Sequence, residues 1–370
     1  MLNYIDLTIA FFISAVTALL VTFPVKKLAV RIGAMDKPNH RKIHQSVTPR
    51  LGGLAIFIGA LFGMLYLQPR HVFIDEILIG SLIILITGAL DDKYTIRPLI
   101  KLSGQVIAAG LLIYAGLIIE RITIPLLGVV ELGFLGPVLT FFWIIGITNA
   151  INLIDGLDGL ATGVTTIAMI SIFAMALVDT QVLVAYLCIS FIGANIGFLY
   201  HNFYPAKIYM GDTGSNLLGY IIAIISILGL FKNITFFSFI IPIVILAVPI
   251  FDTLVAMIRR MYNKEGIMTA DRRHIHYQLI DAGYSHRKTV VIIYLFSGLF
   301  GVIGILFSEA DLAISLLFTA VMIALLHIFA ELAGLVMGGR RPVVTMLRRI
   351  KAFLFKPFKK RKKSRKSSDS

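Results

Sequence analysis

Long runs of apolar residues alternate with short polar segments from one end of the chain to the other. Runs of roughly 18 or more residues recur, which is about the length that a helix needs to cross a bilayer. Because an open sheet would leave backbone groups unpaired in lipid, we expect an all-α, polytopic integral membrane protein. The pattern predicts about eleven membrane-spanning helices, at residues 7–28, 51–68, 76–90, 100–119, 134–150, 162–178, 182–200, 214–230, 236–258, 288–306 and 312–336.

Composition agrees with this pattern. Hydrophobic residues make up 58% of the chain and charged residues 15%, with a mean hydropathy of +0.90, which is far more apolar than an ordinary soluble domain. The first span resembles a signal peptide in length, but residues 1–8 carry no basic segment and no small-residue cleavage site follows, so we expect it to be retained. The single cysteine, Cys188, lies inside a predicted span and excludes an intramolecular disulfide.

Basic residues lie almost entirely on one side of the predicted spans. Of the 34 Lys and Arg, all but Arg70, Arg121 and Lys232 fall on the same side. Lys and Arg of short loops are retained in the cytoplasm, so we predict an outer N-terminus and a cytoplasmic C-terminus. An odd number of spans gives the same answer independently.

The chain becomes polar after the last predicted span. We divide it into a membrane-embedded domain, residues 1–336, and a basic cytoplasmic tail, residues 337–370, which we expect to be disordered. Its Lys and Arg fit attraction to anionic lipid headgroups, and a simple orientation signal is an equal alternative. Nothing folded accompanies this charge, so we expect no nucleic-acid partner.

Aspartates gather at the predicted cytoplasmic ends of the spans, whereas the acids on the outer side are scattered singly. Asp91 and Asp92 directly follow the third span. Adjacent carboxylates at a membrane boundary repel each other unless a cation or a proton relieves them, which indicates a metal site or a general base. Asp252 lies inside the ninth span, where a buried acid is functional by default, with a Lys or Arg of a facing loop as its expected partner.

Two further segments on the same face carry oxygen ligands. Asn149, Asn152 and Asp155 are three residues apart and would lie near one side of a helical turn, while Gly156 and Gly159 follow the carboxylates Asp155 and Asp158 and permit close backbone approach to a ligand. These donors predict a hard cation, Mg²⁺ with Mn²⁺ as a substitute. Asp212, in the segment 209–215 before the eighth span, can complete the site, and the Gly and hydroxyl groups around it suit phosphate.

Two inner loops carry cations that suit a polyanionic substrate such as a diphosphate. The first runs from Asp36 through residues 37–44 to Arg50, and the last holds Arg272, Arg273, His274 and His276. Paired histidines leave a zinc site as an alternative for the second loop.

Together these motifs resemble the polyprenyl-phosphate N-acetylhexosamine-1-phosphate transferases, the family of MraY, WecA and TagO. The resemblance covers about residues 30–290, with its motifs in order, and is closest to the TagO/WecA branch. It implies a bacterial plasma-membrane enzyme that transfers GlcNAc-1-phosphate from UDP-GlcNAc to undecaprenyl phosphate at the cytoplasmic face and releases UMP. The product would begin the synthesis of wall teichoic acid or a related surface polymer, and a homodimer is compatible with the family.

The resemblance also implies roles for individual residues. Asp212 and Asn152 would hold Mg²⁺, Asp91 and Asp92 would lie near the polyprenyl phosphate, and Lys101 matches a functional lysine. Residues of the donor site would be Asn149, Asp155, Gly156, Leu157, Asp158 and Tyr209, together with Arg272, Arg273, His274 and His276 for the sugar and diphosphate.

The chain departs from the family at Tyr277, which takes the place of a final histidine. This departure disfavours the peptide-bearing UDP-MurNAc substrate. We expect direct attack of the lipid phosphate on the donor, with Asp91 as base, positioner or nucleophile. The alternatives are a related transferase for another UDP-N-acetylhexosamine and a cation-coupled transporter, which the lack of an internal repeat disfavours.

Overall fold

A computed structural model of the chain describes residues 2–36, 47–124, 128–229, 240–262, 264, 274–308, 310 and 312–332. Helices dominate this part of the chain, and two short antiparallel hairpins lie outside the apolar segments. The helices are α1 (Tyr4–Ile32), α2 (Gly52–Leu67), α3 (Ile74–Tyr94), α4 (Pro98–Tyr114), α5 (Leu135–Ile154), α6 (Leu160–Val178), α7 (Val182–Asn202), α8 (Gly211–Gly229), α9 (Ile240–Ile245), α10 (Ala247–Tyr262), α11 (Ile275–Asp281), α12 (His286–Ser308) and α13 (Leu312–Leu332). The strands are β1 (Met35–Asp36), β2 (Thr48–Pro49), β3 (Arg121–Ile124) and β4 (Gly128–Glu131).

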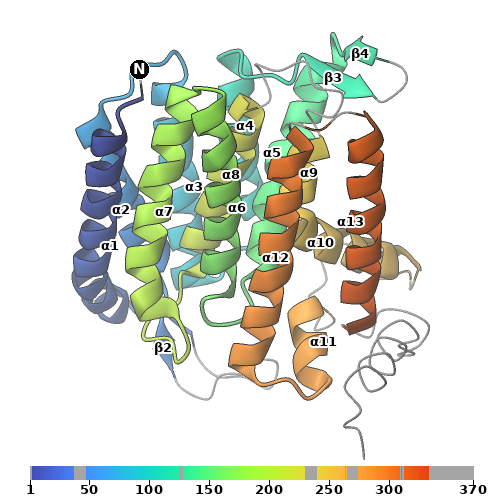
Figure 1. Ribbon diagram of the computed structural model, residues 1–370. Helices are drawn as coiled ribbons and strands as arrows, with labels where there is room; N and C mark the ends of the chain where they lie inside the picture. Colours follow the sequence, from blue (N-terminus) through green and yellow to red (C-terminus); the bar gives the residue numbers. More distant parts are fainter. Residues whose placement is uncertain are drawn as a thin grey trace, which may run out of the picture.

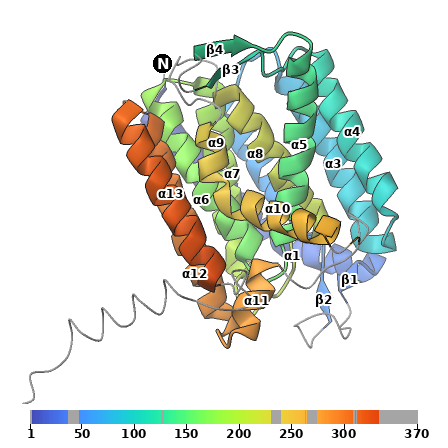
Figure 2. The same ribbon diagram turned by 90° about the vertical axis from the view of Figure 1, so that its right-hand side faces the viewer.

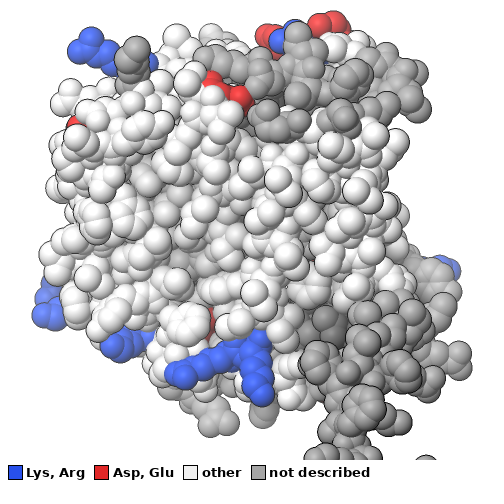
Figure 3. Space-filling view, in the orientation of Figure 1, with Lys and Arg blue, Asp and Glu red and all other residues white. Residues whose placement is uncertain are grey.

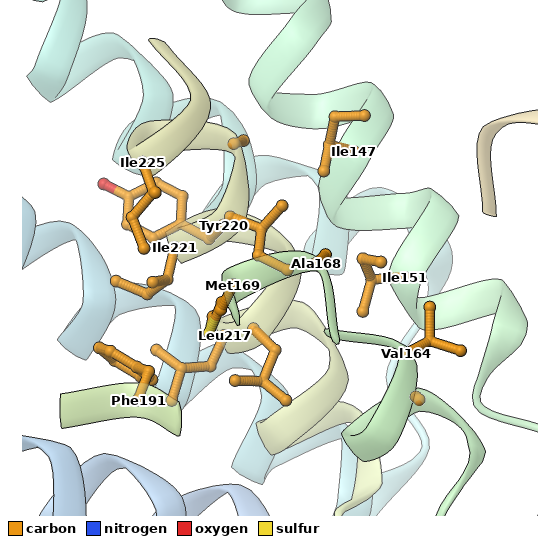
Figure 4. Packing of buried hydrophobic residues seen from close by; sticks show 14 of the residues in the cluster. Ile147, Ile151, Val164, Ala168, Met169, Phe191, Leu217, Tyr220, Ile221 and Ile225 are labelled. Carbon is orange, nitrogen blue, oxygen red and sulfur yellow. The ribbon is translucent and has the colours of Figure 1, made fainter. Parts of the chain in front are cut away.

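The long helices form one bundle with α8 at its centre (Figure 1). Of the most apolar 18-residue window of α8, 94% is buried, against 17% for α13 at the edge. Around α8 pack Ile147 and Ile151 of α5, Ala168 and Met169 of α6, and Phe191 of α7 (Figure 4). The helix that carries Asp212 in its first turn is therefore surrounded by protein and not by lipid.

The prediction of an all-α membrane protein is confirmed at this level. Within the described residues, seven helices are long and apolar enough to cross a membrane: α1, α5, α6, α7, α8, α12 and α13. Helices α2 and α4 are apolar but shorter, and α3 carries acidic residues in its first turn and at its C-terminal end. The number of crossings and the orientation stay predictions.

The ninth predicted span, 236–258, is not one continuous helix. It is broken at Leu246 into α9 and α10, and α10 turns away from the direction of α9 (Figure 2). Pro249 explains the break, because a proline has no N–H for the carbonyl four residues earlier and its ring clashes with that turn. The prolines at 242 and 249 were the available signal for this correction.

Helices α1, α2 and α7 pack unusually closely through small residues. A Cβ at Gly63 of α2 would overlap the Ser14 hydroxyl of α1, and a Cβ at Gly197 of α7 would overlap the Ala15 carbonyl. Small residues allow helix backbones to approach within a membrane, where apolar burial between helices contributes little. These contacts fix the wall of the bundle beside α8.

Charges separate toward the two ends of the molecule (Figure 3). Most of the Lys and Arg of this face lie at the end that carries β2 and α11, whereas most of its acidic residues lie at the opposite end, near β3 and β4, together with a few Lys or Arg. Lipid-facing side chains between the two ends are almost all uncharged, as the middle of a membrane protein requires.

Candidate active site

Three helices bring the predicted acidic segments together at one end of the bundle. Asp91 and Asp92 end α3, Asn152 and the loop that follows it end α5, and Asp212 lies in the first turn of α8. Helix α8 contacts α3 and α5 along its length. Side chains of these segments that are separated by up to 121 positions in the sequence are therefore in hydrogen-bond contact.

Lys101 of α4 lies where the oxygen ligands converge. Its ammonium donates to Asp91 Oδ2 at 3.4 Å, to Asn152 Oδ1 at 3.3 Å and to Asp212 Oδ2. Burial, together with the Asp212 carboxylate, raises the pKa of Asp91 to about 7. Asn152 in turn donates to Asp212 Oδ1 at 3.2 Å and to Ser215 Oγ at 2.7 Å.

The same oxygens suit a hard cation, because a positive ammonium is already held by two carboxylates and an amide carbonyl. No group of three or more His, Cys, Asp or Glu side chains that could hold a metal occurs in the described part of the chain. A divalent cation at Asp212 and Asn152 would therefore take further ligands from water or substrate phosphates, which is the usual coordination of Mg²⁺.

Asp92 differs from its neighbour in its environment. Its carboxylate accepts hydrogen bonds from the backbone N–H of Asp212 at 2.9 Å, from the N–H of Thr213 at 3.0 Å and from the Thr213 hydroxyl. The Asp92 side chain is fully buried, whereas 15% of Asp91 is exposed. A carboxylate in this place caps the N-terminus of α8. Asp92 thus holds the turn that carries Asp212.

The loop between α5 and α6 carries the residues predicted to bind the nucleotide. Asp155 caps the C-terminus of α5, and burial together with the Asp212 charge raises the pKa of its carboxyl group to about 8. The Asp158 carboxylate accepts from the backbone N–H of Ala206 at 2.8 Å, and the Asp158 N–H donates to His286 Nε2 at 3.0 Å. Asp158 therefore joins this loop to α12 and to the segment after α7.

Tyr209 is fixed by the backbone of the first inner loop. Its N–H donates to the Pro49 carbonyl at 2.8 Å, and its own carbonyl accepts from Gly52 at 3.0 Å. A Cβ at Gly53 would overlap the backbone of Gly214, so the loop approaches α8 as closely as glycine permits. Tyr209 thereby lines the wall of a pocket.

That pocket has a volume of about 680 Å³. It brings together most of the predicted donor-site residues, Asp36 and Arg50 of the first inner loop, Gly211 of the segment 209–215, and several residues that the sequence did not assign to a site. The predicted residues are Asn152, Asp155, Gly156, Leu157, Asp158, Tyr209 and Asp212, and the others are Asp36, Arg50, Asn202, Tyr204, Pro205, Ala206, Gly211, Tyr277 and His286. Asp91 and Lys101 adjoin it through Asp212.

Asn149 lies apart from the pocket lining. Its amide donates to Gln105 Oε1 at 2.7 Å and to the Ile145 carbonyl at 2.8 Å, and Gln105 donates to Asn216 at 3.1 Å. This chain of amides joins α4, α5 and α8 below the site. Its geometry gives Asn149 a supporting position.

The last inner loop is described in part. Arg272 and Arg273 lie outside the described residues. His274 Nδ1 is 3.0 Å from Asp252 Oδ2, so the partner of the buried acid is a histidine rather than a Lys or Arg in the described part of the loop. His276 stacks on His274 at 5.9 Å between ring centroids, and its ring lies against Gly156.

Burial lowers the pKa of His276 to about 3, so this ring is neutral. Neither of its buried nitrogens has a hydrogen-bond partner among the described residues. His276 therefore supports the nucleotide loop from behind, beside the pocket.

Sequence reasoning did not assign His286 or Tyr204 to the site. His286 and Tyr204 have ring centroids 4.5 Å apart, but they belong to segments 82 positions apart with no motif spacing between them. Ser215 belongs to the singled-out segment 209–215 and contacts Asn152. Only the turn of α8 reveals which of its hydroxyl groups faces the site.

Comparisons with known proteins agree with this geometry. The profile of a family described as glycosyl transferase family 4 matches residues 76–230. The chain is 44% identical, over 94% of its length and 97% of the relative, to a probable undecaprenyl-phosphate N-acetylglucosaminyl 1-phosphate transferase of Bacillus subtilis.

Two other relatives are more distant. A decaprenyl-phosphate N-acetylglucosaminephosphotransferase of Mycobacterium tuberculosis is 32% identical over 91% of this chain and 88% of the relative. An undecaprenyl-phosphate alpha-N-acetylglucosaminyl 1-phosphate transferase of Escherichia coli is 30% identical over 77% of this chain and 79% of the relative.

Proposed function

Because this chain belongs to glycosyl transferase family 4 and is a glycosyl-1-phosphate transferase, we propose that it transfers GlcNAc-1-phosphate from UDP-GlcNAc to undecaprenyl phosphate. One observation carries this proposal: Lys101 joins Asp91, Asn152 and Asp212 beside a pocket lined by Asp155 and Tyr209. Such a centre brings a cation-binding cluster next to a cavity of nucleotide size. Phosphoryl transfer requires this combination of alignment and charge neutralisation.

The charge of the pocket supports a requirement for Mg²⁺. Asp36, Asp155, Asp158 and Asp212 line it, and Arg50 is the one Lys or Arg among the described lining residues. A nucleoside diphosphate is itself an anion and would be repelled by uncompensated carboxylates. Mg²⁺ held by Asp212 and Asn152 would neutralise the diphosphate, and Arg272 and Arg273 of the last inner loop would add positive charge.

The proposed reaction exchanges one phosphoanhydride for another. An oxygen of the lipid phosphate forms a bond to the β-phosphorus of UDP-GlcNAc, the bond from this phosphorus to the bridging oxygen breaks, and UMP leaves with that oxygen. Asp91 lies beside Lys101 and is partly exposed, so we assign it to the acceptor, where it orients the lipid phosphate and takes its proton. Asp155 and Tyr209 hold the base and exclude water from it.

A transfer assay tests this function. Membranes that contain the protein, Mg²⁺ and undecaprenyl phosphate are given radiolabelled UDP-GlcNAc, UDP-GalNAc or UDP-MurNAc-pentapeptide in parallel. We expect label in the lipid extract from UDP-GlcNAc, with an equal amount of UMP, and loss of both in Asp212→Asn or after chelation. Uptake of label without a lipid product would support a transporter instead, and preferential use of either other donor would correct the substrate.

Topology and pathway belong to the same proposal. The predicted spans would cross a bacterial plasma membrane, the ninth through the broken pair α9 and α10, with the N-terminus outside and the pocket at the cytoplasmic face. The clustering of Lys and Arg at the end that carries β2 and α11 supports this orientation (Figure 3). The lipid product would begin wall teichoic acid or a related surface polysaccharide.

A further inference from the structure

Arg50 lines the acidic pocket. Its guanidinium Nη2 lies 3.4 Å from Asp36 Oδ1, and Nη1 lies 3.9 Å from Asp92 Oδ1. It is also near enough to Asp212 and Asp155 to interact with both electrostatically. Arg50 thus lies between the proposed metal ligands and the nucleotide loop.

The backbone holds Arg50 in this place from both sides. Its own N–H donates to the Ala34 carbonyl at 3.0 Å, and the preceding residue, Pro49, accepts from Tyr209 at 2.8 Å. Tyr209 leads directly into the turn of Asp212. The position of the guanidinium relative to the metal-binding turn is therefore set by short backbone links and not by the side chain alone.

The hydrogen-bonding capacity of Arg50 is largely unused. Within the part of the chain that the structure describes, its Nε is buried without a hydrogen-bond partner, and the 3.9 Å from Nη1 to Asp92 Oδ1 is beyond hydrogen-bond distance. A guanidinium has five N–H donors in a planar fork that matches a carboxylate or phosphate. An arginine that served only to neutralise Asp36 would be expected to present two parallel short bonds to it.

The side chain remains accessible from the pocket, because 28% of it is exposed. Arg50 is therefore accessible, has N–H donors without a partner among the described residues, and lies near four carboxylates. These three features together suit the binding of an anionic ligand. Among the described lining residues no other Lys or Arg reaches the cavity.

We propose that Arg50 binds a phosphate group of the nucleoside diphosphate donor. This inference rests on the proposed function for the identity of the donor. Arg50 would align the diphosphate between the proposed metal-binding turn and the nucleotide loop, and would make the pocket discriminate diphosphate nucleotides from uncharged nucleosides.

Binding of a ligand series tests this assignment. Dissociation constants for uridine, UMP and UDP are measured by calorimetry with the full-length protein in detergent and Mg²⁺, for the wild type, Arg50→Gln and Arg50→Lys. We expect Arg50→Gln to weaken UDP by about 10- to 100-fold, the usual worth of a charge-assisted hydrogen bond, and to leave uridine within about twofold. Arg50→Lys should recover part of the loss, because it restores charge without the fork.

Two comparisons separate ligand binding from a structural role. Arg31→Gln removes an exposed cation at the end of α1, outside the pocket, and should leave all three ligands unchanged. If Arg50 only neutralises Asp36, the double variant Asp36→Asn/Arg50→Gln will regain UDP affinity, and this outcome would overturn the inference. An equal loss for uridine and UDP would overturn it as well.

The same data distinguish this inference from the proposed function. A wild-type protein that binds UDP through Arg50 but forms no lipid product refutes the transfer reaction and keeps the phosphate site. A protein that forms the lipid product while Arg50→Gln binds UDP normally refutes the phosphate site alone.

Discussion

Adjacent aspartates at the end of α3 have different environments because successive helical residues point about 100° apart. Asp91 faces Lys101, and Asp92 faces the backbone of Asp212 and Thr213. Three donors converge on the Asp92 carboxylate. Position 211 requires a glycine, because a Cβ there would overlap this carboxylate. One residue of the pair faces the chemistry, and the other supports it.

Substitutions of this pair should separate stability from activity. Asp92→Asn places an amide N–H₂ among N–H and O–H donors, so the thermal unfolding midpoint in detergent should fall, as expected for the loss of about 1–3 kcal/mol when buried donors lose their acceptor. Asp91→Asn should abolish GlcNAc-1-phosphate transfer at an unchanged midpoint. Equal midpoints for the two variants would contradict the assignment of Asp92 as the cap of α8.

A second pair at this scale is Gly156 and His276. Gly156→Ala would drive a Cβ into the buried ring of His276, and we expect a lower unfolding midpoint, in line with about 1–3 kcal/mol for overpacking. Adding His276→Ala should restore the midpoint by making room, although the support of the nucleotide loop is lost. If the double variant unfolds at the temperature of Gly156→Ala alone, the two side chains are not in the contact described.

Single residues also mark the limit of sequence reasoning. Asp91, Asn152, Asp155 and Asp212 were predictable because each stands in a motif with a chemical spacing. The opposing tasks of Asp91 and Asp92, and the contact of His286 with Asp158, depend on side-chain directions that arise only when distant helices pack.

Helices show a similar division between local and tertiary information. The length of the apolar runs located the membrane-spanning segments, since the thickness of a bilayer sets the length of a helix that crosses it. The break between α9 and α10 was not predicted because its prolines were read as part of one apolar run. Small residues at positions 59, 63, 193 and 197 determine how closely α1, α2 and α7 approach, and apolar length carries no information about that distance.

The close contact of α1, α2 and α7 gives a prediction at the scale of helices. Gly63→Leu should prevent α2 from approaching Ser14 of α1 and lower the yield of folded protein in detergent, measured by size-exclusion chromatography, as overpacking costs about 1–3 kcal/mol or more. Gly110→Leu in α4 is the matched control, because a Cβ at Gly110 meets nothing within 4 Å. Equal yields from the two variants would show that α2 does not depend on this contact.

At the scale of the whole molecule, the separation of charge between the two ends defines an expected orientation in the membrane. The one cysteine, Cys188, is fully buried, so a cysteine introduced elsewhere reports on its own position. Val72, which is 78% exposed, precedes α3 at the end expected outside, and Arg31 ends α1 at the end expected inside.

Labelling with a membrane-impermeant maleimide tests this orientation. In intact cells we expect Val72→Cys to react and Arg31→Cys to react only after the membrane is opened. The wild type should stay unlabelled in both conditions. Labelling of Arg31→Cys in intact cells would reverse the proposed topology while leaving the geometry of the pocket unchanged.

The burial of α8 on every side has a consequence for how the enzyme would respond to its membrane. Changes in bilayer thickness and lateral pressure act first on helices that touch lipid, such as α1 and α13, which tilt to match it. Helix α8 has 94% of its apolar window enclosed by protein, so it has little contact with lipid through which such changes could act on it. We therefore expect Asp212 to keep its place relative to Asn152 and Lys101 in bilayers of different composition, so that lipids would regulate the delivery of the acceptor rather than the alignment of the reacting groups.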